Sequence, residues 1–175
     1  MKEIKWAVLG CGVIANEMAV ALQKNGKNIY AVGNRTHEKA AAFAEKYGIG
    51  KVYDDFHEMF TDPEVDVIYI TTPHNTHLGF MKEAIANGKH ILVEKSITLN
   101  SDELDEAIAL AKEKGVIIGE AMTIYHMPIY KELKKISRLR PSRQSQSDHD
   151  ELRQFQRVQH EEPLLQPESR RRRDA

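Results

Sequence analysis

A glycine-rich segment near the start of the chain most constrains what the sequence can fold into. Residues 10–15 read Gly-Cys-Gly-Val-Ile-Ala, which is the pattern G-x-G-x-x-A. A short apolar run over residues 4–9 precedes it, and residues 13–24 carry apolar side chains at helical spacing. A strand, a glycine turn and a helix in this order form the corner that binds a pyrophosphate in dinucleotide-binding domains.

Each small residue of this corner has a physical task. Gly10 permits a tight turn, Gly12 lets a pyrophosphate approach the backbone, and Ala15 lets the helix pack closely on the strand. The first helical residues, Val13 and Ile14, offer backbone N–H groups and the positive end of the helix dipole. We therefore expect residues Gly10, Gly12, Val13, Ile14 and Ala15 to bind a dinucleotide. The alternative is an ordinary strand–helix turn.

Apolar strands alternate with helices along the rest of the chain as far as residue 118. The predicted strands are residues 4–9, 29–32, 51–53, 65–70, 90–93 and 116–118. The predicted helices are residues 13–24, 38–47, 56–60, 78–86 and 101–114. Strands that are apolar on both faces and alternate with helices indicate a parallel sheet covered on both sides. The predicted fold class is α/β, a Rossmann-type doubly wound parallel sheet.

Composition excludes several other classes of protein. The chain has 175 residues and a net charge of -1, so one domain with a sizeable core fits, and neither nucleic acid nor a membrane is expected as a partner. Cys11 is the single cysteine, which rules out an internal disulfide. No signal peptide and no apolar run of membrane-spanning length is recognisable. A cytoplasmic location is therefore expected.

The end of the second predicted strand bears on the choice between NAD and NADP. An acidic residue there would bind the ribose 2′-hydroxyl of NAD, but this chain has Asn34 and Arg35, and no carboxylate before Glu38. An arginine can pair with the 2′-phosphate of NADP or stack on adenine. We predict that Asn34 and Arg35 contact the cofactor and that NADP is favoured over NAD. A solvated loop arginine is the alternative.

Three blocks of sequence, taken together, resemble the Gfo/Idh/MocA family, the glucose-fructose oxidoreductase and inositol dehydrogenase group. They are GCGVIA at residues 10–15, TTPHNTH at residues 71–77 and VEKSITLN at residues 93–100. The resemblance runs from Met1 to about Ile136, and residues 120–122 add a likeness to the dihydrodiol dehydrogenase branch. It implies an NAD(P)-dependent oxidoreductase that acts on a sugar, polyol or diol.

The resemblance also assigns roles to the second block. In the family, this block follows the fourth strand and lies along the cofactor, which implies that Thr72, Pro73, His74 and His77 contact the cofactor here. The end of a parallel strand is where ligands meet an open sheet, and a proline fixes the turn at that end. For the two histidines alone, helix capping or surface placement is the alternative.

The third block matches the family's E-K-P motif at Glu94 and Lys95, with Ser96 in place of the proline. The resemblance implies that Glu94 and Lys95 lie at the cofactor and that Lys95 is catalytic, because a lysine can polarise the carbon–oxygen bond that undergoes hydride transfer. A serine leaves the backbone of this turn freer than a proline would. Without the family context, Glu94 and Lys95 would be read as a surface charge pair. No metal site is expected.

Composition changes abruptly at Ser137. Before it the basic residues are 15 lysines and one arginine, and after it they are nine arginines with seven acidic residues among them. A disordered tail and a nucleic-acid-binding arm are two interpretations. A third is a shifted reading frame, and it is favoured because permitted codons for residues 153–175, read one base later, replace the four consecutive arginines by a stretch that contains Gly-Gly.

We therefore assign residues 1–136 to an NAD(P)-binding Rossmann domain and residues 137–175 to a tail that does not look native. The family's second domain, with its acid/base histidine, is expected to be absent, so cofactor binding with little turnover is predicted. A homo-oligomer is expected only where that domain is present. The alternatives are a non-catalytic dinucleotide-binding module and a methyltransferase, although Asn34 and Arg35 replace the acidic residue that a methyltransferase would need.

Overall fold

A computed structural model of the chain describes residues 3–139. The chain divides into two compact units, the first ending at Met122 and the second beginning at Thr123. The sequence-based domain boundary at residue 136 falls inside the second unit. The predicted tail begins within the last helix of that unit, and residues 140–175 lie outside the described part of the chain.

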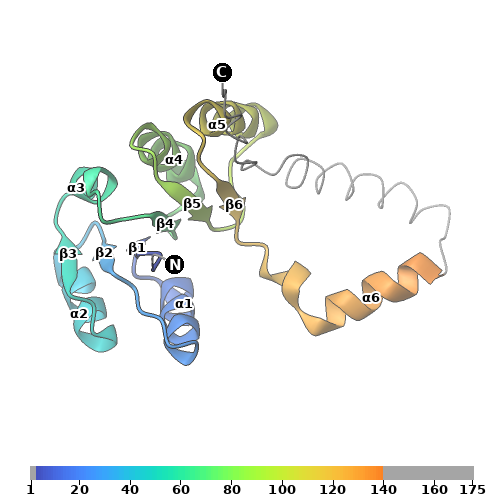
Figure 1. Ribbon diagram of the computed structural model, residues 1–175, viewed down its shortest axis with the longest axis horizontal. Helices are drawn as coiled ribbons and strands as arrows, with labels where there is room; N and C mark the ends of the chain where they lie inside the picture. Colours follow the sequence, from blue (N-terminus) through green and yellow to red (C-terminus); the bar gives the residue numbers. More distant parts are fainter. Residues whose placement is uncertain (1–2, 140–175) are drawn as a thin grey trace, which may run out of the picture. The chain divides into compact units, whose positions relative to one another are not determined.

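The first unit is built on one six-stranded sheet (Figure 1). Its strands are β1 (Trp6–Leu9), β2 (Ala31–Gly33), β3 (Lys51–Tyr53), β4 (Val67–Ile70), β5 (His90–Val93) and β6 (Ile118–Glu120). All neighbouring pairs are parallel, and their order across the sheet is β3-β2-β1-β4-β5-β6. This arrangement confirms the predicted Rossmann-type α/β fold. The chain crosses from one half of the sheet to the other between β3 and β4, so β1 and β4 lie side by side at the centre.

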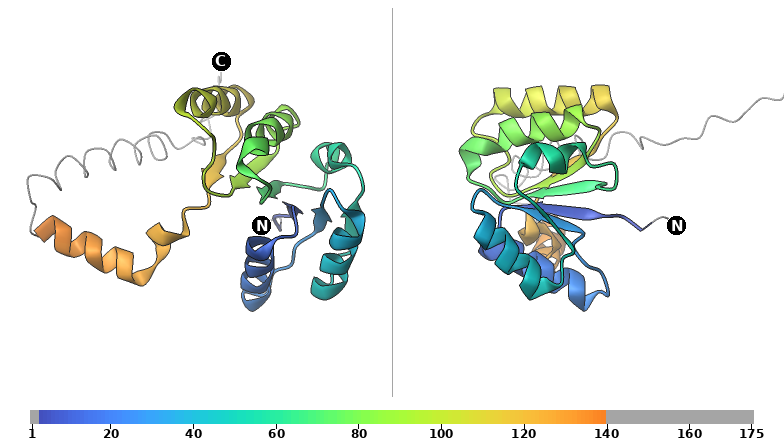
Figure 2. Two further views of the ribbon diagram at one scale, coloured as in Figure 1. Left: turned by 180° about the vertical axis from the view of Figure 1, so that it is seen from behind. Right: turned by 90° about the vertical axis from the view of Figure 1, so that its left-hand side faces the viewer.

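Helices cover both faces of this sheet (Figures 1 and 2). On one face lie α1 (Val13–Lys24) and α2 (His37–Tyr47). On the other lie α3 (Phe56–Thr61), α4 (His77–Ala86), which follows the short 3-10 helix η1 (His74–Thr76), and α5 (Ser101–Lys114). Strands of such a sheet are buried on both sides, which is why they read as continuous apolar runs.

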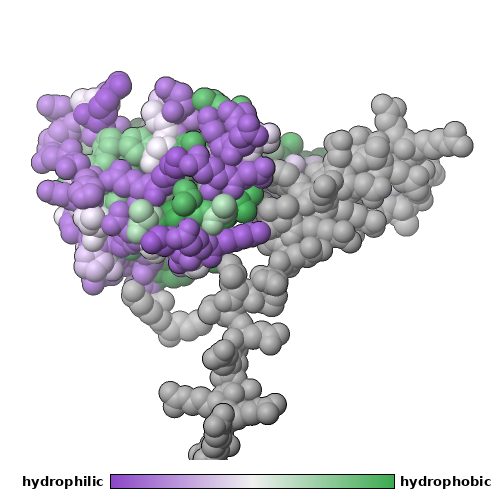
Figure 3. Space-filling model, turned by 90° about the horizontal axis from the view of Figure 1, so that it is seen from above, coloured by the Kyte–Doolittle hydropathy of each residue, from purple (hydrophilic) through white to green (hydrophobic). Residues whose placement is uncertain are grey.

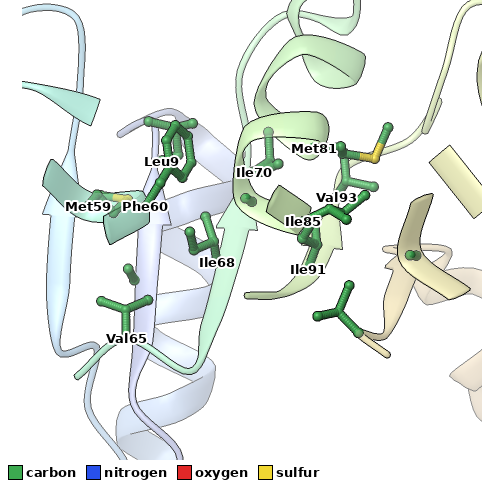
Figure 4. Packing of buried hydrophobic residues seen from close by; sticks show 14 of the residues in the cluster. Leu9, Met59, Phe60, Val65, Ile68, Ile70, Met81, Ile85, Ile91 and Val93 are labelled. Carbon is green, nitrogen blue, oxygen red and sulfur yellow. The ribbon is translucent and has the colours of Figure 1, made fainter. Parts of the chain in front are cut away.

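Two apolar clusters fill the two interfaces between sheet and helices. Leu9, Ile68 and Ile70 project from the sheet into the cluster that also contains Phe60 of α3 and Met81 of α4 (Figure 4). The second cluster joins Val8 and Val32 to α1 and α2. Polar residues make up much of the surface seen in Figure 3, with apolar patches among them. Because neighbouring residues of a strand point to opposite faces of the sheet, Leu9 belongs to the first cluster and Val8 to the second.

Most of the predicted elements are confirmed, several of them with unchanged ends. The bounds of α1, β3, β5 and α5 are the predicted ones. Asn100 caps α5 by accepting a hydrogen bond from the Glu103 backbone N–H at 2.9 Å, and Gly115 ends it with a φ of 67°. Local capping signals of this kind are readable in a sequence, which explains the agreement.

The last strand of the sheet lies two residues later than predicted. Val116 is apolar, but its backbone N–H bonds to the Ala111 carbonyl as part of the end of α5. The backbone carbonyl of Ile117 accepts from Ile91, and aligned pairing with β5 starts at Ile118. The apolar residue at position 116 belongs to the helix cap rather than to the strand.

The second unit contains a helix that the sequence interpretation missed. It begins with the 3-10 helix η2 (Thr123–His126) and continues as α6 (Pro128–Leu139). Ile129, Leu133 and Ile136 recur at helical spacing, and a proline suits the first helical turn. These signals stand just before the change in composition at Ser137. Among residues 3–139, none of the helices is long and apolar enough to cross a membrane.

A polar cluster stabilises the edge of the sheet at the amino ends of its strands. Asp62, which is 8% exposed, accepts hydrogen bonds from the hydroxyl of Tyr53 and from Lys51 Nζ, the latter at 2.8 Å. Burial alone would raise the pKa of the Asp62 carboxyl, but these two donors outweigh it and lower the pKa to about 2. Lys89 Nζ donates to the Val65 carbonyl at 2.9 Å. This edge is held by ionised and hydrogen-bonded groups.

Candidate functional site

The residues that follow the central strands form one row at the carboxyl edge of the sheet. Leu9 pairs in register with Gly33 and with Ile70, Ile70 pairs with Val93, and Val93 pairs with Glu120. The next residue of each strand is therefore also aligned: these are Gly10, Asn34, Thr71, Glu94 and Ala121. The structure thus brings the four predicted groups of site residues to one edge. In open α/β sheets this edge, between β1 and β4, is where ligands bind.

The glycine turn fits this edge because residue 10 has no side chain. Gly10 has a φ of 105°, which side-chain-bearing residues rarely adopt, and a Cβ atom there would lie 2.5 Å from Thr71 Oγ1. The Gly10 N–H donates to the Gly33 carbonyl at 2.8 Å, and the Thr71 N–H donates to the Leu9 carbonyl at 2.9 Å. The turn is therefore fixed between β2 and β4.

The N-terminus of α1 is open where a phosphate would bind. Gly12 is its N-cap, no side chain caps it, and its first turn holds no acidic residue. A Cβ atom on Gly12 would meet nothing within 4 Å, so there is free space beside the backbone. Val13 is 74% and Ile14 is 40% exposed, whereas Ala15 is fully buried against the sheet. Free N–H groups and exposed apolar side chains at a helix start are suited to an anionic ligand that covers them.

The end of β2 presents one cationic side chain. Arg35 is exposed, and the amide of Asn34 donates to the Thr36 carbonyl at 3.0 Å, which shapes the turn into α2. A Cβ atom on Gly33 would lie 2.8 Å from the Cε of Met59, so a larger residue there would require the methionine side chain to shift. Arg35 lies one residue beyond the aligned row, and its guanidinium group is accessible to a ligand.

The block after β4 is a turn that its own side chains hold. Pro73 has a φ of -60° and precedes η1. The Thr76 hydroxyl lies 2.8 Å from Thr72 Oγ1 and 2.7 Å from the Pro73 carbonyl. These contacts fix the backbone at Thr72 and Pro73. Both residues lie near the glycine turn, because they follow Thr71, which packs against Gly10.

The two histidines of this block reach the chain after β5. His77 is fully buried, with Nδ1 2.9 Å from the Ser96 carbonyl and Nε2 2.9 Å from the Thr72 carbonyl. His74 is exposed, and its Nε2 lies 2.8 Å from the Lys95 carbonyl. A carbonyl oxygen only accepts, and a neutral imidazole ring carries one N–H, so a neutral His77 ring donates to one of its two carbonyls at a time. The two imidazole rings lie edge to face, 5.5 Å apart between centroids.

Glu94 and Lys95 lie where β5 ends. The Glu94 carboxylate accepts a hydrogen bond from the hydroxyl of Tyr69 through Oε1, and Oε2 lies 3.3 Å from the backbone nitrogen of Lys95. Burial raises the pKa of the Tyr69 phenol, and the bond to Glu94 raises it further, so Tyr69 remains a donor. Lys95 itself is exposed at the edge. Glu94 therefore orients the chain next to Lys95.

Glu120 makes a backbone contact at this site that sequence interpretation did not identify. Its Oε1 accepts a hydrogen bond from the Ile97 backbone N–H at 2.9 Å. The carboxylate thus bonds to the backbone two residues after Lys95. Because Glu120 ends β6, the topology of the sheet places it at the carboxyl edge, but its partner depends on how the chain after β5 folds back.

Cys11, in the glycine turn, is not an activated nucleophile. It is half-buried, and burial raises the pKa of its thiol to about 11. Within the described residues, no group of three or more His, Cys, Asp or Glu side chains is arranged to hold a metal ion. A surface cavity of about 760 Å³ shares Cys11, Gly12 and Val13 with the turn, but it extends along α1 to Lys24 and away from the aligned row.

Comparisons with known proteins agree with this geometry. Residues 4–122 match a family model described as an oxidoreductase family with an NAD-binding Rossmann fold, GFO_IDH_MocA. A trans-1,2-dihydrobenzene-1,2-diol dehydrogenase from Xenopus tropicalis is 33% identical over 135 residues, which are 75% of this chain and 41% of that enzyme. A 1,5-anhydro-D-fructose reductase from Ensifer adhaerens is 32% identical over 116 residues, which are 66% of this chain and 35% of the reductase.

A solved structure shows the same arrangement of the first unit. It is a 3-ketoreductase from Actinomadura kijaniata in complex with NADP and TDP-benzene, with 26% identity and a TM-score of 0.72. The match covers 77% of this chain and 42% of the ketoreductase. The chain thus spans about two fifths of the length of the relatives that it matches.

Proposed function

The chain belongs to the Gfo/Idh/MocA oxidoreductase family, and we propose that the carboxyl edge of its sheet binds NADP or NAD for hydride transfer to or from a sugar, polyol or diol. The relatives include a diol dehydrogenase and a 3-ketoreductase, whose names support a substrate with a hydroxyl or carbonyl group. The chain spans only part of the length of these relatives, so the reaction of the whole protein is part of this proposal.

The uncapped N-terminus of α1 is the observation on which the proposal depends. The pyrophosphate binds against the backbone of Gly12 and the N–H groups of the first helical turn, where a side chain would otherwise intrude. Gly10 and Thr71 fix this turn at the centre of the sheet. Val13 and Ile14, both exposed, are covered by the bound nucleotide.

Arg35 determines whether NADP or NAD is preferred, through its contact with the adenine ribose. A guanidinium one residue beyond the row donates paired hydrogen bonds to a 2′-phosphate, and Asn34 shapes the turn that holds it there. In the absence of an acidic residue at this strand end, the 2′-hydroxyl of NAD gains no comparable partner. NADP is therefore the favoured cofactor, and NAD is the second.

Thr72, Pro73, His74 and Glu94 would hold the nicotinamide half of the cofactor next to Lys95. His77 was predicted to contact the cofactor, but its ring is fully buried, so it would act through the Thr72 carbonyl instead. When bound, the nicotinamide ring supplies or accepts the hydride. The Lys95 ammonium donates a hydrogen bond to the substrate oxygen, which stabilises the negative charge that builds on this oxygen as a carbonyl is reduced. Its exposure at the edge lets Lys95 reach a substrate from the solvent side.

Nucleotide titration of the purified chain tests the proposal. NADPH, NADH and S-adenosylmethionine are titrated separately, with fluorescence and thermal melting as readouts. We expect binding of NADPH, weaker binding of NADH and none of S-adenosylmethionine. Binding of S-adenosylmethionine alone would identify a methyltransferase, and no binding of any of the three would overturn the proposal.

A matched pair of glycine variants locates the site. Gly12→Asp places a carboxylate where the pyrophosphate binds, and we expect it to reduce NADPH affinity by a factor of 100 or more, on the order of 3 kcal/mol. Gly50→Asp is the control, because Gly50 is exposed, lies before β3 at the opposite edge and also has free space around it. The control should bind NADPH like the unaltered chain.

A further inference from the structure

Four backbone groups around Lys95 are each contacted by a side chain. The Lys95 backbone nitrogen lies 3.3 Å from Glu94 Oε2, and the Lys95 carbonyl lies 2.8 Å from His74 Nε2. The Ser96 carbonyl lies 2.9 Å from His77 Nδ1, and the Ile97 N–H donates to Glu120 Oε1 at 2.9 Å. We name residues 95–97 the lysine turn.

We propose that His74 and His77, together with Glu120, are positioning residues that set the backbone of the lysine turn and thereby the reach of Lys95. This inference rests on the proposed function, because it concerns the same site. None of the three has to touch substrate, and each acts through a backbone group of the turn.

The contacts come from the segment after β4 and from the end of β6. His74 is in η1, His77 opens α4, and Glu120 ends β6. Because η1 and α4 form one continuous segment after β4 whereas Glu120 belongs to β6, the turn is contacted from two separate parts of the first unit. A hydrogen bond contributes modestly to stability on its own, but several at consecutive backbone groups restrict which conformation the turn adopts.

His77 also connects the lysine turn to the block after β4. Its second ring nitrogen lies 2.9 Å from the carbonyl of Thr72, a residue that lies along the proposed cofactor site. The ring is fully buried, so water does not compete for either contact. The positions of Thr72 and Ser96 are therefore set by one side chain, which couples the cofactor-facing block to the lysine.

Ser96 explains why such support is needed. A serine at this position restricts the backbone less than a proline ring does. The lysine turn therefore depends on side chains from other elements for its conformation. The Ser96 carbonyl bonds to the buried ring of His77, and the Lys95 carbonyl bonds to the more accessible ring of His74.

Two nucleotide probes distinguish positioning from folding. NADPH contains the nicotinamide half, whereas 2′,5′-ADP contains only the adenosine half with its 2′-phosphate. We expect His74→Ala and His77→Leu to weaken NADPH binding about tenfold and to leave binding of 2′,5′-ADP unchanged. His57→Ala is the control, since His57 lies on α3 and pairs with Glu83 at the surface; it should leave both affinities unchanged.

A double-variant cycle shows whether the histidines act through Lys95. In a Lys95→Ala background, His74→Ala should have no further effect on NADPH affinity. With Lys95 present, His74→Asn, which retains a hydrogen-bond donor, should lose at most half of the NADPH-binding free energy that His74→Ala loses. Equal loss of both probes, or full additivity with Lys95→Ala, would show a purely structural role and overturn the inference.

Backbone relaxation measured without nucleotide separates this inference from the proposed function. In the unaltered chain, the amides of Lys95, Ser96 and Ile97 should be as rigid as those of β5, and in His77→Leu and Glu120→Ala, which remove the side-chain donor and acceptor, they should become mobile on the nanosecond timescale. If the chain bound no nucleotide, the proposed function would fail while this measurement would still decide the positioning role. Unchanged relaxation in both variants would contradict the positioning role.

Discussion

The Thr71 hydroxyl oxygen occupies the space that a side chain on Gly10 would need, with only 2.5 Å between Thr71 Oγ1 and the position of a Cβ atom on residue 10. The same hydroxyl donates to the Leu9 carbonyl at 3.0 Å. The residues that follow β1 and β4 are therefore packed in direct contact at the centre of the sheet.

Replacing Gly10 by alanine is expected to lower the free energy of unfolding by about 2–4 kcal/mol, because the new Cβ clashes with Thr71 and the φ of 105° is strained for alanine. Adding Thr71→Ala should recover part of this loss by removing Oγ1, but not the strain in φ. Urea denaturation of the two single variants and the double variant measures the coupling. Gly50→Ala serves as the control, and strict additivity of the two changes would contradict the packing argument.

Replacing Arg35 by alanine is expected to change the preference between cofactors. Affinity for NADPH should fall about 10- to 100-fold with the loss of charged hydrogen bonds to the 2′-phosphate, and affinity for NADH should change less than threefold. Fluorescence titration with each cofactor measures this ratio. Lys27→Ala removes an exposed cation at the opposite edge and should change neither affinity. A proportional loss of both cofactors with Arg35→Ala would show that Arg35 does not read the ribose.

Asp62 is expected to contribute to acid stability. Its folded-state pKa of about 2 lies below the ordinary value of 3.8, so its contribution is present above about pH 4 and is lost as the pH falls toward 2. Asp62→Asn should lower the free energy of unfolding at pH 7 by about 1–2 kcal/mol and flatten its decline between pH 4 and pH 2. Denaturant unfolding across that range tests this, with exposed Asp105→Asn as the control.

The Cys11 thiol is expected to react slowly with iodoacetamide. Because burial raises its pKa to about 11, the thiolate fraction at pH 8 is small, and alkylation should be about 100-fold slower than for an unfolded chain. The rate should increase with pH up to about 11, and saturating NADPH should slow it further because Cys11 lies within the glycine turn. Mass spectrometry follows the reaction. Alkylation in urea at the rate of a free thiol provides the reference.

Much of the fold was predictable because its signals are local. A few residues are enough to predict an element in three places. These are the glycine turn, the cap of α5 at Asn100 and Gly115, and the apolar run of β4. Val116 shows the limit, since an apolar residue suits both a strand and the end of a helix, and only the pairing with β5 decides between them. The helix α6 was missed although Ile129, Leu133 and Ile136 show its period.

The site was predictable as a set of residues but not as a set of contacts. Parallel strands bring their carboxyl ends together, so Gly10, Arg35, Thr72 and Lys95 are placed at one edge by topology alone. The bond between His77 and the Ser96 carbonyl joins residues 19 apart and depends on how α4 packs beneath the turn. Sequence spacing does not encode that packing.

The two edges of the sheet have different tasks. Asp62, Lys51 and Lys89 brace the amino edge, whereas the proposed nucleotide contacts lie at the carboxyl edge. Changes that alter cofactor choice at Arg35 therefore leave the groups that secure the scaffold untouched. A protein arranged in this way can acquire new ligand preferences without the loss of thermodynamic stability that often accompanies a change of function.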